Sequence, residues 1–216
     1  VDQPEALPDA GLKPALRPRP CPPVAARPTS LALTKIRTLI RDPYATYAQY
    51  ILRLKPLNPL RAQPDARDRG IAIHTILQRF VTERPMGETA FDARTRLLTI
   101  AAEVFAQETP FPSARALWLA RLERAADHFL RQAERWGGQT LLTEEKGAVA
   151  VGDTGFTLTG TPDRIDQRPD GSVVLIDYKT GTPPSKLQQT TLDLQLHLAA
   201  AMAERVRWQL DAWIAS

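Results

Sequence analysis

Two aspartates and a lysine flank a tight turn within residues 159–181. Asp163 ends one run of alternating apolar and polar residues, and Asp177 and Lys179 end the next run. Successive side chains of a strand point to opposite faces, so Asp177 and Lys179 should share one face. An antiparallel pairing through the Pro-Asp-Gly turn at residues 169–171 should bring Asp163 near Asp177. The spacing therefore predicts one cluster of two carboxylates and an ammonium group.

Two adjacent carboxylates repel each other, and a divalent cation between them removes this cost. Magnesium and manganese accept carboxylate oxygens and keep water ligands. Such an ion lowers the pKa of a bound water and neutralises charge on a phosphate. Lys179 would orient or deprotonate the attacking water, or stabilise the developing negative charge. The cluster indicates metal-dependent phosphodiester hydrolysis; the alternative is a surface ion pair beside a turn aspartate.

Three strands and one helix are predicted to carry this cluster. The strands cover residues 147–151, 156–166 and 172–180, and the helix runs from Thr190 to about Arg207. Gly160 lies beside the proposed site, where the lack of a side chain permits close backbone approach. Helices precede the strand meander and one helix follows it, which predicts an α/β class with an α+β-like order.

The first half of the chain has helical periodicity. Thr34 is a predicted helix N-cap, and Asp42-Pro43 restarts a helix after a short break. The clearest helical pattern is that of residues 68–83, whose apolar residues are spaced to form one buried face. The predicted helices cover residues 44–54, 68–83, 91–107 and 113–136, and the buried stripe of the second comprises Ile73, Ile76, Leu77, Phe80 and Val81.

The arginines and tyrosines of these helices allow two interpretations. The tyrosines of residues 44–54 suit core packing, and the alternative is contact with nucleic acid. The arginines of residues 113–136 suit a solvated face, and the alternative is a stripe that tracks phosphates. These arginines are Arg115, Arg121, Arg124, Arg131 and Arg135.

Composition sets outer limits on function. The 216 residues are 43% hydrophobic and 24% charged, with a net charge of +4. This is typical of a globular protein and compatible with a polyanionic partner. No apolar run is long enough to span a membrane, and the proline-rich start does not resemble a secretory signal. Cys21 is the only cysteine, which excludes a disulfide framework and favours a reducing cytoplasm.

Residues 1–29 hold eight of the nineteen prolines and are predicted to form a linker or extended arm. The remaining residues, 30–216, are predicted to form one domain. No phosphate-binding loop of the G-x-x-x-x-G-K-[ST] type occurs, so an ATP-driven motor would have to lie elsewhere.

Five motifs occur in one order along the chain, and together they resemble the RecB-like branch of the PD-(D/E)XK nucleases over roughly residues 30–200. The resemblance implies a restriction-endonuclease-like core, a short mixed sheet flanked by helices, with an N-terminal helical region. The motifs are Asp42-Pro-Tyr44, Arg69-Gly-x-x-x-His74, Gly160-Thr-Pro-Asp163, Asp177-Tyr-Lys179-Thr-Gly181 and Gln195.

The resemblance also implies roles for individual residues. It implies metal ligation by His74, Asp163, Asp177 and the carbonyl of Tyr178. It further implies that Lys179 is the catalytic lysine and that Gln195 positions water or phosphate. Judged by itself, His74 lies at the edge of an apolar stripe, where a histidine is more often a packed core residue than a ligand.

The function implied is a deoxyribonuclease dependent on Mg²⁺, or alternatively Mn²⁺, with exonuclease action on single-stranded DNA. Within this branch the likeness is to AddB-type subunits, which implies an AddA-like helicase-nuclease partner, double-strand break repair and recombination, and a bacterial cytoplasm. One alternative is a catalytically silent DNA-binding or scaffolding module of the same fold. Another is a stand-alone nuclease of the superfamily.

Three features depart from the family pattern. Ala199 stands where relatives often have a tyrosine four residues after Gln195. Cys21 alone cannot hold the iron-sulfur cluster that four cysteines hold in many relatives. The chain ends 21 residues after Gln195, where relatives usually add strands, so the domain is expected to be truncated at its C-terminus.

Overall fold

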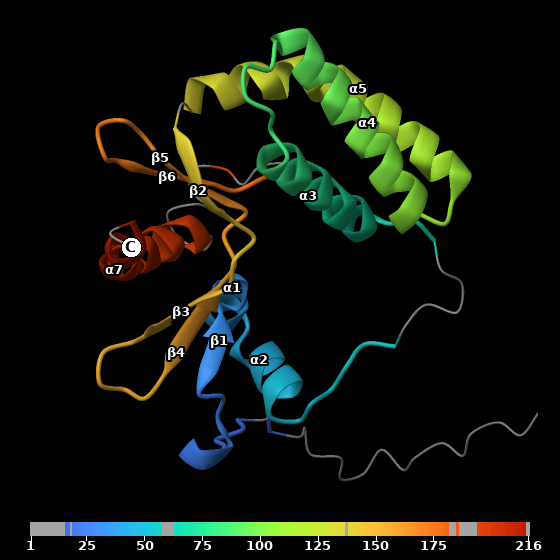
Figure 1. The fold of residues 1–216 in the computed structure, drawn as a ribbon. Helices are drawn as coiled ribbons and strands as arrows, with labels where there is room; N and C mark the ends of the chain where they lie inside the picture. Colours follow the sequence, from blue (N-terminus) through green and yellow to red (C-terminus); the bar gives the residue numbers. More distant parts are fainter. Residues whose placement is uncertain are drawn as a thin grey trace, which may run out of the picture.

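A computed structural model describes residues 16–17, 19–57, 63–136, 138–181, 185 and 194–214, with backbone alone for 206–214. The fold is α/β: helices flank two small sheets, as Figure 1 shows. Part of the predicted arm, residues 1–15 and 18, and the predicted helix start at residues 190–193 lie outside the described residues. None of the described helices is both long and apolar enough to cross a membrane.

The helices follow the predicted order with shifted ends. Asp42 caps the second helix as predicted, because its carboxylate accepts a hydrogen bond from the Ala45 N–H at 3.1 Å. The prediction of Thr34 as an N-cap is wrong, since the first helix already begins at Leu33. The helices are α1 (Leu33–Arg41), α2 (Pro43–Tyr50), α3 (Ala66–Thr82), α4 (Ala90–Glu108), α5 (Pro112–Trp136) and α7 (Gln195–Ile214), with a short 3-10 helix at Val24–Ala26.

Helix α2 ends earlier than the predicted residue 54. The Leu54 N–H donates to the Ala48 carbonyl at 2.9 Å, and Arg53 has a φ of 57°. A residue with left-handed backbone dihedrals, next to an N–H that donates back to a carbonyl more than one turn earlier, is typical of a helix C-terminus. Residues 51–57 therefore leave α2 as a non-helical segment.

Helices α3, α4 and α5 form the main hydrophobic core. Ile76, Leu77 and Phe80 of the predicted stripe are buried, which confirms the periodicity of α3. Ile73 and Val81 are partly buried against the same cluster. The core continues into α4 and α5, where the most buried residues are Leu97, Ile100, Ala101, Val104, Phe105, Ala114, Trp118 and Ala126.

The strands form two three-stranded sheets rather than one meander. In the first sheet, β4 (Thr157–Gly160) pairs in parallel with β1 (Ser30–Ala32) and antiparallel with β3 (Gly147–Ala150). In the second, antiparallel β5 (Arg164–Gln167) lies between β2 (Gln139–Thr143) and β6 (Val173–Ile176). Helix α7 contacts β3 and β6, one strand of each sheet (Figure 1).

This topology corrects the predicted strand at residues 156–166. The segment divides at Thr161-Pro162, and its halves, β4 and β5, belong to different sheets. Proline has no N–H for a ladder hydrogen bond, so a strand interrupted there is favoured. The predicted strand at residues 172–180 was also too long, because β6 ends at Ile176.

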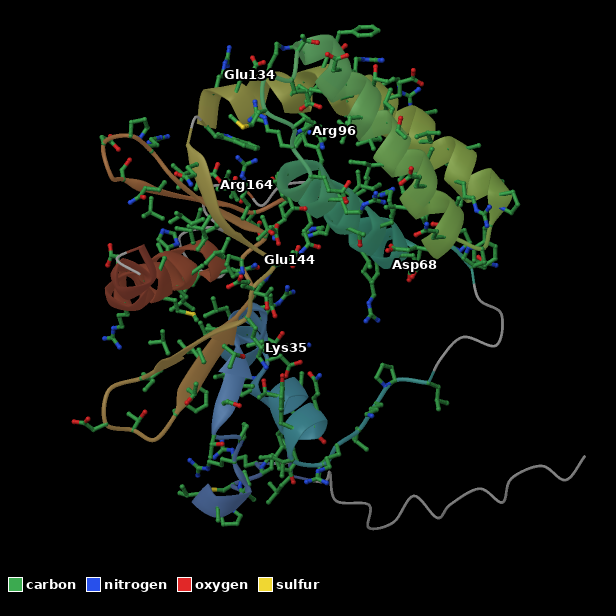
Figure 2. The ribbon with its side chains drawn as sticks, viewed as in Figure 1. Lys35, Asp68, Arg96, Glu134, Glu144 and Arg164 are labelled. Carbon is green, nitrogen blue, oxygen red and sulfur yellow. The ribbon has the colours of Figure 1, made fainter. Side chains whose placement is uncertain are left out.

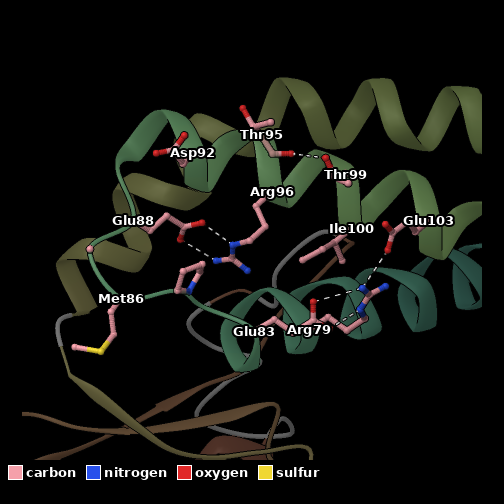
Figure 3. A pocket seen from close by; sticks show the side chains of 12 residues that line it. Arg79, Glu83, Met86, Glu88, Asp92, Thr95, Arg96, Thr99, Ile100 and Glu103 are labelled. Atoms are coloured by element: carbon pink, nitrogen blue, oxygen red, sulfur yellow. Dashed lines mark hydrogen bonds and ion pairs between the residues drawn. The ribbon is translucent and has the colours of Figure 1, made fainter.

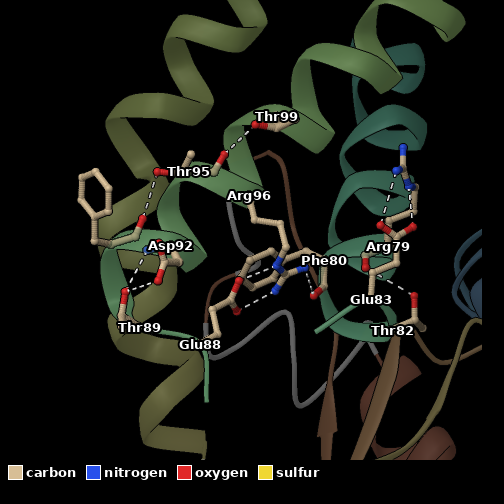
Figure 4. A network of polar contacts seen from close by, with 11 residues as sticks. Arg79, Phe80, Thr82, Glu83, Glu88, Thr89, Asp92, Thr95, Arg96 and Thr99 are labelled. Atoms are coloured by element: carbon tan, nitrogen blue, oxygen red, sulfur yellow. Dashed lines mark hydrogen bonds and ion pairs between the residues drawn. The ribbon is translucent and has the colours of Figure 1, made fainter. Parts of the chain in front are cut away.

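A polar corner joins α3 to α4 away from the strands (Figures 3 and 4). Arg96 donates to both carboxylate oxygens of Glu88, at 2.5 and 2.9 Å, and to the Phe80 carbonyl at 2.8 Å. Its guanidinium also lies 4.2 Å from the centre of the Phe80 ring. One arginine thus fixes the C-terminal end of α3, the connecting loop and the first half of α4.

We expect Arg96→Ala to lower the free energy of unfolding by about 2–4 kcal/mol, because it leaves the Glu88 carboxylate, only 4% exposed, without its counter-charge. Urea unfolding measures this change. Arg121→Ala, an exposed arginine on α5, is the control and should change stability by about 0.5 kcal/mol or less. Equal effects of the two substitutions would contradict the structural role of Arg96.

Candidate active site

Asp163 lies where the two sheets meet, in the link between β4 and β5. One carboxylate oxygen, Oδ2, accepts a hydrogen bond of 2.5 Å from the Tyr178 N–H. The β5–β6 register pairs Arg164 with Ile176, so Asp163 lies one step beyond this pair, on the side of Asp177. The predicted approach of these two segments is therefore present, although both aspartates lie just outside the ladder.

His74 turns toward these segments. Its Nδ1 lies 3.3 Å from Asp163 Oδ1 and also 3.3 Å from Glu144 Oε1. Its Nε2 lies 3.1 Å from the carbonyl oxygen of Tyr178. The ring thus contacts Asp163 and the Tyr178 carbonyl, two of the three groups predicted to ligate metal with it.

Glu144 is a member of this cluster that the sequence analysis missed. It follows β2 and lies between α3 and the sheets in Figure 2, with a φ of 51°. Its N–H reaches the carbonyls of Pro162 at 3.1 Å and Asp163 at 3.3 Å. These bonds hold a backbone conformation that costs energy in a residue other than glycine. The only signal was an acidic residue in a turn, because β2 was itself not predicted.

Asp177, Lys179 and Gln195 form an adjacent group. The Lys179 ammonium lies 2.6 Å from Asp177 Oδ2, and the Gln195 side-chain amide donates to Asp177 Oδ1 at 3.2 Å. Asp177 is only 12% exposed, whereas Lys179 is 43% exposed. Lys179 and Gln195 thus each contact Asp177, and the lysine is open to solvent.

Several further contacts support this arrangement. Arg69, from the Arg-Gly pair of α3, donates to the Thr180 carbonyl at 3.4 Å. A Cβ on Gly160 would lie 2.7 Å from Leu33 Cδ1, so α1 packs directly on the strand that leads to Asp163. The Tyr178 ring is held among those of Phe129 and Trp136, with centroids 6.1 and 6.3 Å away.

A buried ion pair fixes the strand that follows Asp163. Arg164 donates to both oxygens of Asp166 at 2.6 Å, and Asp166 is fully buried. Both hydrogen bonds are charge-assisted and bidentate, which restrains the direction of each side chain. The start of β5, and with it Asp163, is therefore held in one orientation.

The oxygens around His74 change its protonation. Its contact with the Asp163 carboxylate is the largest cause that raises the pKa of His74 to about 9, with Glu144 adding to it and burial opposing it. A ring with carboxylates at Nδ1 and a carbonyl at Nε2 satisfies both contacts only when both nitrogens carry hydrogen. Without metal, a proton on His74 thus supplies the positive charge that the surrounding oxygens favour.

The donor set fits a divalent cation. Ligand atoms of His74, Glu144 and Asp163 all lie within 4.8 Å of one another, and among the described residues no other His, Cys, Asp or Glu joins this group. Imidazole nitrogen with carboxylate and carbonyl oxygens suits Mn²⁺ and, through its oxygens, Mg²⁺. Asp177 lies outside the group, so its role as a metal ligand stays a prediction.

The fold and site define a nuclease of the PD-(D/E)XK type. The family model of the PD-(D/E)XK nuclease superfamily matches residues 30–213, and the chain belongs to this superfamily. The resemblance drawn from the five motifs is therefore confirmed at the level of the family.

Relatives of the chain fall into two groups. An uncharacterised protein of Rickettsia bellii is 29% identical over 74% of this chain and 20% of its own length. An ATP-dependent helicase/deoxyribonuclease subunit of Streptococcus agalactiae is 26% identical over 75% of this chain and 15% of its own length. The protein of the same name from Streptococcus mutans is 26% identical over 78% of this chain and 15% of its own length. The chain thus spans about a fifth or less of these relatives.

We expect Mn²⁺ to raise the melting temperature of the chain, because ion binding to the folded state alone stabilises it. Glu144→Gln, Asp163→Asn and His74→Gln should each remove most of this rise. Glu145→Gln is the matched control, since this exposed neighbour of Glu144 lies outside the ligand group. A rise unchanged in all three site variants would show that the ion binds elsewhere.

In EDTA, stability should fall as pH rises from 6.5 to 9. The pKa of His74 in the folded state, about 9, exceeds the ordinary value of 6.5. Protonated His74 therefore stabilises the folded state fully below pH 6.5, and this stabilisation is lost as the pH rises through 9. The change should be about 2 kcal/mol after allowance for partial exposure. Urea unfolding at several pH values measures it.

His74→Gln should abolish most of this pH dependence, whereas His128→Gln, at an exposed position on α5, should retain it. The same slope in wild type and His74→Gln would mean that His74 does not carry the effect.

Proposed function

We propose that the chain is a metal-dependent deoxyribonuclease domain that hydrolyses phosphodiester bonds. The observation that supports it best is the convergence of His74, Asp163 and the Tyr178 carbonyl beside the Asp177–Lys179 pair. Membership of the PD-(D/E)XK superfamily supports the same chemistry.

In this proposal His74, Asp163, Asp177, Glu144 and the Tyr178 carbonyl hold the cation. When bound, the cation lowers the pKa of water and offsets charge on the phosphate. The other proposed roles belong to side chains of the protein. Lys179, whose ammonium reaches solvent, orients the attacking water or stabilises charge that develops on phosphate oxygen.

Gln195 is proposed to act as a positioning residue. Its amide donates to Asp177 Oδ1 while Lys179 contacts Oδ2, so each oxygen of Asp177 has a partner. Two partners fix the plane of the carboxylate. We infer that Gln195, from the start of α7, keeps Asp177 and Lys179 aligned toward the phosphate.

The finer parts of the proposal rest on the relatives and motifs. We infer Mg²⁺ as the ion, with Mn²⁺ as the alternative, and exonuclease action on single-stranded DNA. The names of the streptococcal relatives support a place in a helicase-nuclease assembly with an AddA-like partner, for double-strand break repair and recombination. A cytoplasmic site of action completes this proposal.

The test is cleavage of labelled single-stranded DNA by the purified chain, and by the complete protein with its helicase partner. We expect cutting that requires Mg²⁺ or Mn²⁺, and a loss of about a hundredfold or more for Asp177→Asn and Lys179→Ala. Lys146→Ala, an exposed lysine before β3, should cut like wild type.

Release of mononucleotides or short oligonucleotides from a labelled end would identify exonuclease action, and internal cuts in circular DNA would contradict it. DNA binding without any cleavage by the complete assembly would instead identify a catalytically silent module. Equal cutting by wild type and Lys179→Ala would refute the proposed active site.

A further inference from the structure

A segment beside the active site carries a net positive charge. Residues 33–55, which comprise α1, α2 and the following segment, are here called the α1–α2 segment. They contain five lysines and arginines and one aspartate, a net charge of +4 that equals the net charge of the whole chain. The basic residues are Lys35, Arg37, Arg41, Arg53 and Lys55.

These five charges have no acidic partners within the part of the chain that the structure describes. By contrast, Arg79 of α3 and both arginines of α4, Arg94 and Arg96, form ion pairs. Positive charges without acidic partners produce a field that attracts a polyanion. Arg41, Arg53 and Lys55 are moreover exposed.

Aromatic and apolar side chains alternate with these charges. Tyr44 is 53% exposed, and its ring centroid lies 5.8 Å from that of Tyr47. Leu39, Ile40, Leu52 and Leu54 are also exposed. A basic surface interleaved with exposed aromatic rings is the pattern that binds single strands, whose bases are free to stack. A duplex would present phosphates but no free base faces.

The α1–α2 segment lies against the active site. Helix α1 contacts β4 and α7, the elements that lead to Asp163 and carry Gln195. Leu33, at its start, fills the space left by Gly160. In Figure 2 Glu144 is labelled just below α3 and Lys35 just above α2. A DNA strand bound to this segment would therefore pass close to the proposed metal ligands.

We propose that the α1–α2 segment is a binding surface for single-stranded DNA that guides the strand to the active site. Its basic side chains contact successive phosphates, and Tyr44 stacks on a base. This inference rests on the proposed nuclease function and extends it, because it names where the chain holds DNA outside the reacting phosphate.

The test is fluorescence anisotropy with labelled oligothymidylate of about 20 nucleotides, in EDTA to prevent cleavage and at several salt concentrations. The triple variant Arg41→Gln/Arg53→Gln/Lys55→Gln should raise Kd about tenfold or more. It should also reduce the slope of log K against log salt by about 2, since each lost phosphate contact on a single strand removes about 0.7. Circular dichroism verifies that the variant is folded.

The matched control removes three charges from α5, as Arg121→Gln/Arg124→Gln/Arg131→Gln, and should stay within about twofold of wild type at equal net charge. Tyr44→Ala should weaken binding without changing the salt slope, and Tyr44→Phe should restore it. An equal loss in the α5 control would overturn the proposal in favour of general electrostatics or an arginine stripe on α5. Unchanged affinity in the α1–α2 variant would also overturn it and leave that surface to a protein partner.

The readouts separate this inference from the nuclease function. Wild type that cuts DNA, with a triple variant that binds and cuts equally well, would refute the guide surface alone. Wild type that binds DNA through this segment but never cuts would refute the nuclease function and support the surface.

Discussion

The carboxylate of Asp163 connects the parts of this fold that must meet for chemistry. One oxygen accepts the N–H of Tyr178, and the other lies 3.3 Å from His74 on α3. Asp163 therefore connects three parts of the fold: the link between β4 and β5, the segment after β6, and helix α3. Its side chain is 10% exposed, so these contacts are made largely out of water, where a charged acceptor needs its partners. Displacement of this carboxylate would separate the histidine from the carbonyl and from the Asp177–Lys179 pair together.

The chain passes from one sheet to the other next to Asp163. Pro162 precedes Asp163 and cannot donate to a ladder, while its carbonyl and that of Asp163 accept the N–H of Glu144. The chain therefore leaves one sheet at Gly160 and enters the other at Arg164. The residues between them are free of strand pairing and can point their side chains toward α3. The buried Arg164–Asp166 pair then fixes the direction in which the chain continues.

The sequence alone was sufficient for features that depend on local pattern. The apolar spacing of α3 predicted its buried face, Asp42-Pro43 predicted a capped helix, and the spacing of Asp163, Asp177 and Lys179 around a turn predicted their approach. Features that depend on distant pairing could not be predicted. Strand β1 has three residues and is defined by its parallel partner β4, and β2 is defined by β5. Glu144 was missed for this reason, since only the pairing of Thr143 with Arg164 brings it to Asp163.

The balance of charge explains why such a site tolerates three carboxylates at close range. Without metal, the imidazolium of His74 and the ammonium of Lys179 each face carboxylate oxygens, at 3.3 and 2.6 Å. These two charges offset all but one of the negative charges of Glu144, Asp163 and Asp177. A divalent cation would replace the proton on His74, because an imidazole nitrogen must be deprotonated to ligate. The same three carboxylates would then be balanced in full by the cation and Lys179. Proton and metal thus compete for the ring nitrogen of His74, and the raised pKa of His74 reflects the preference of the nearby carboxylate oxygens for a positive charge there.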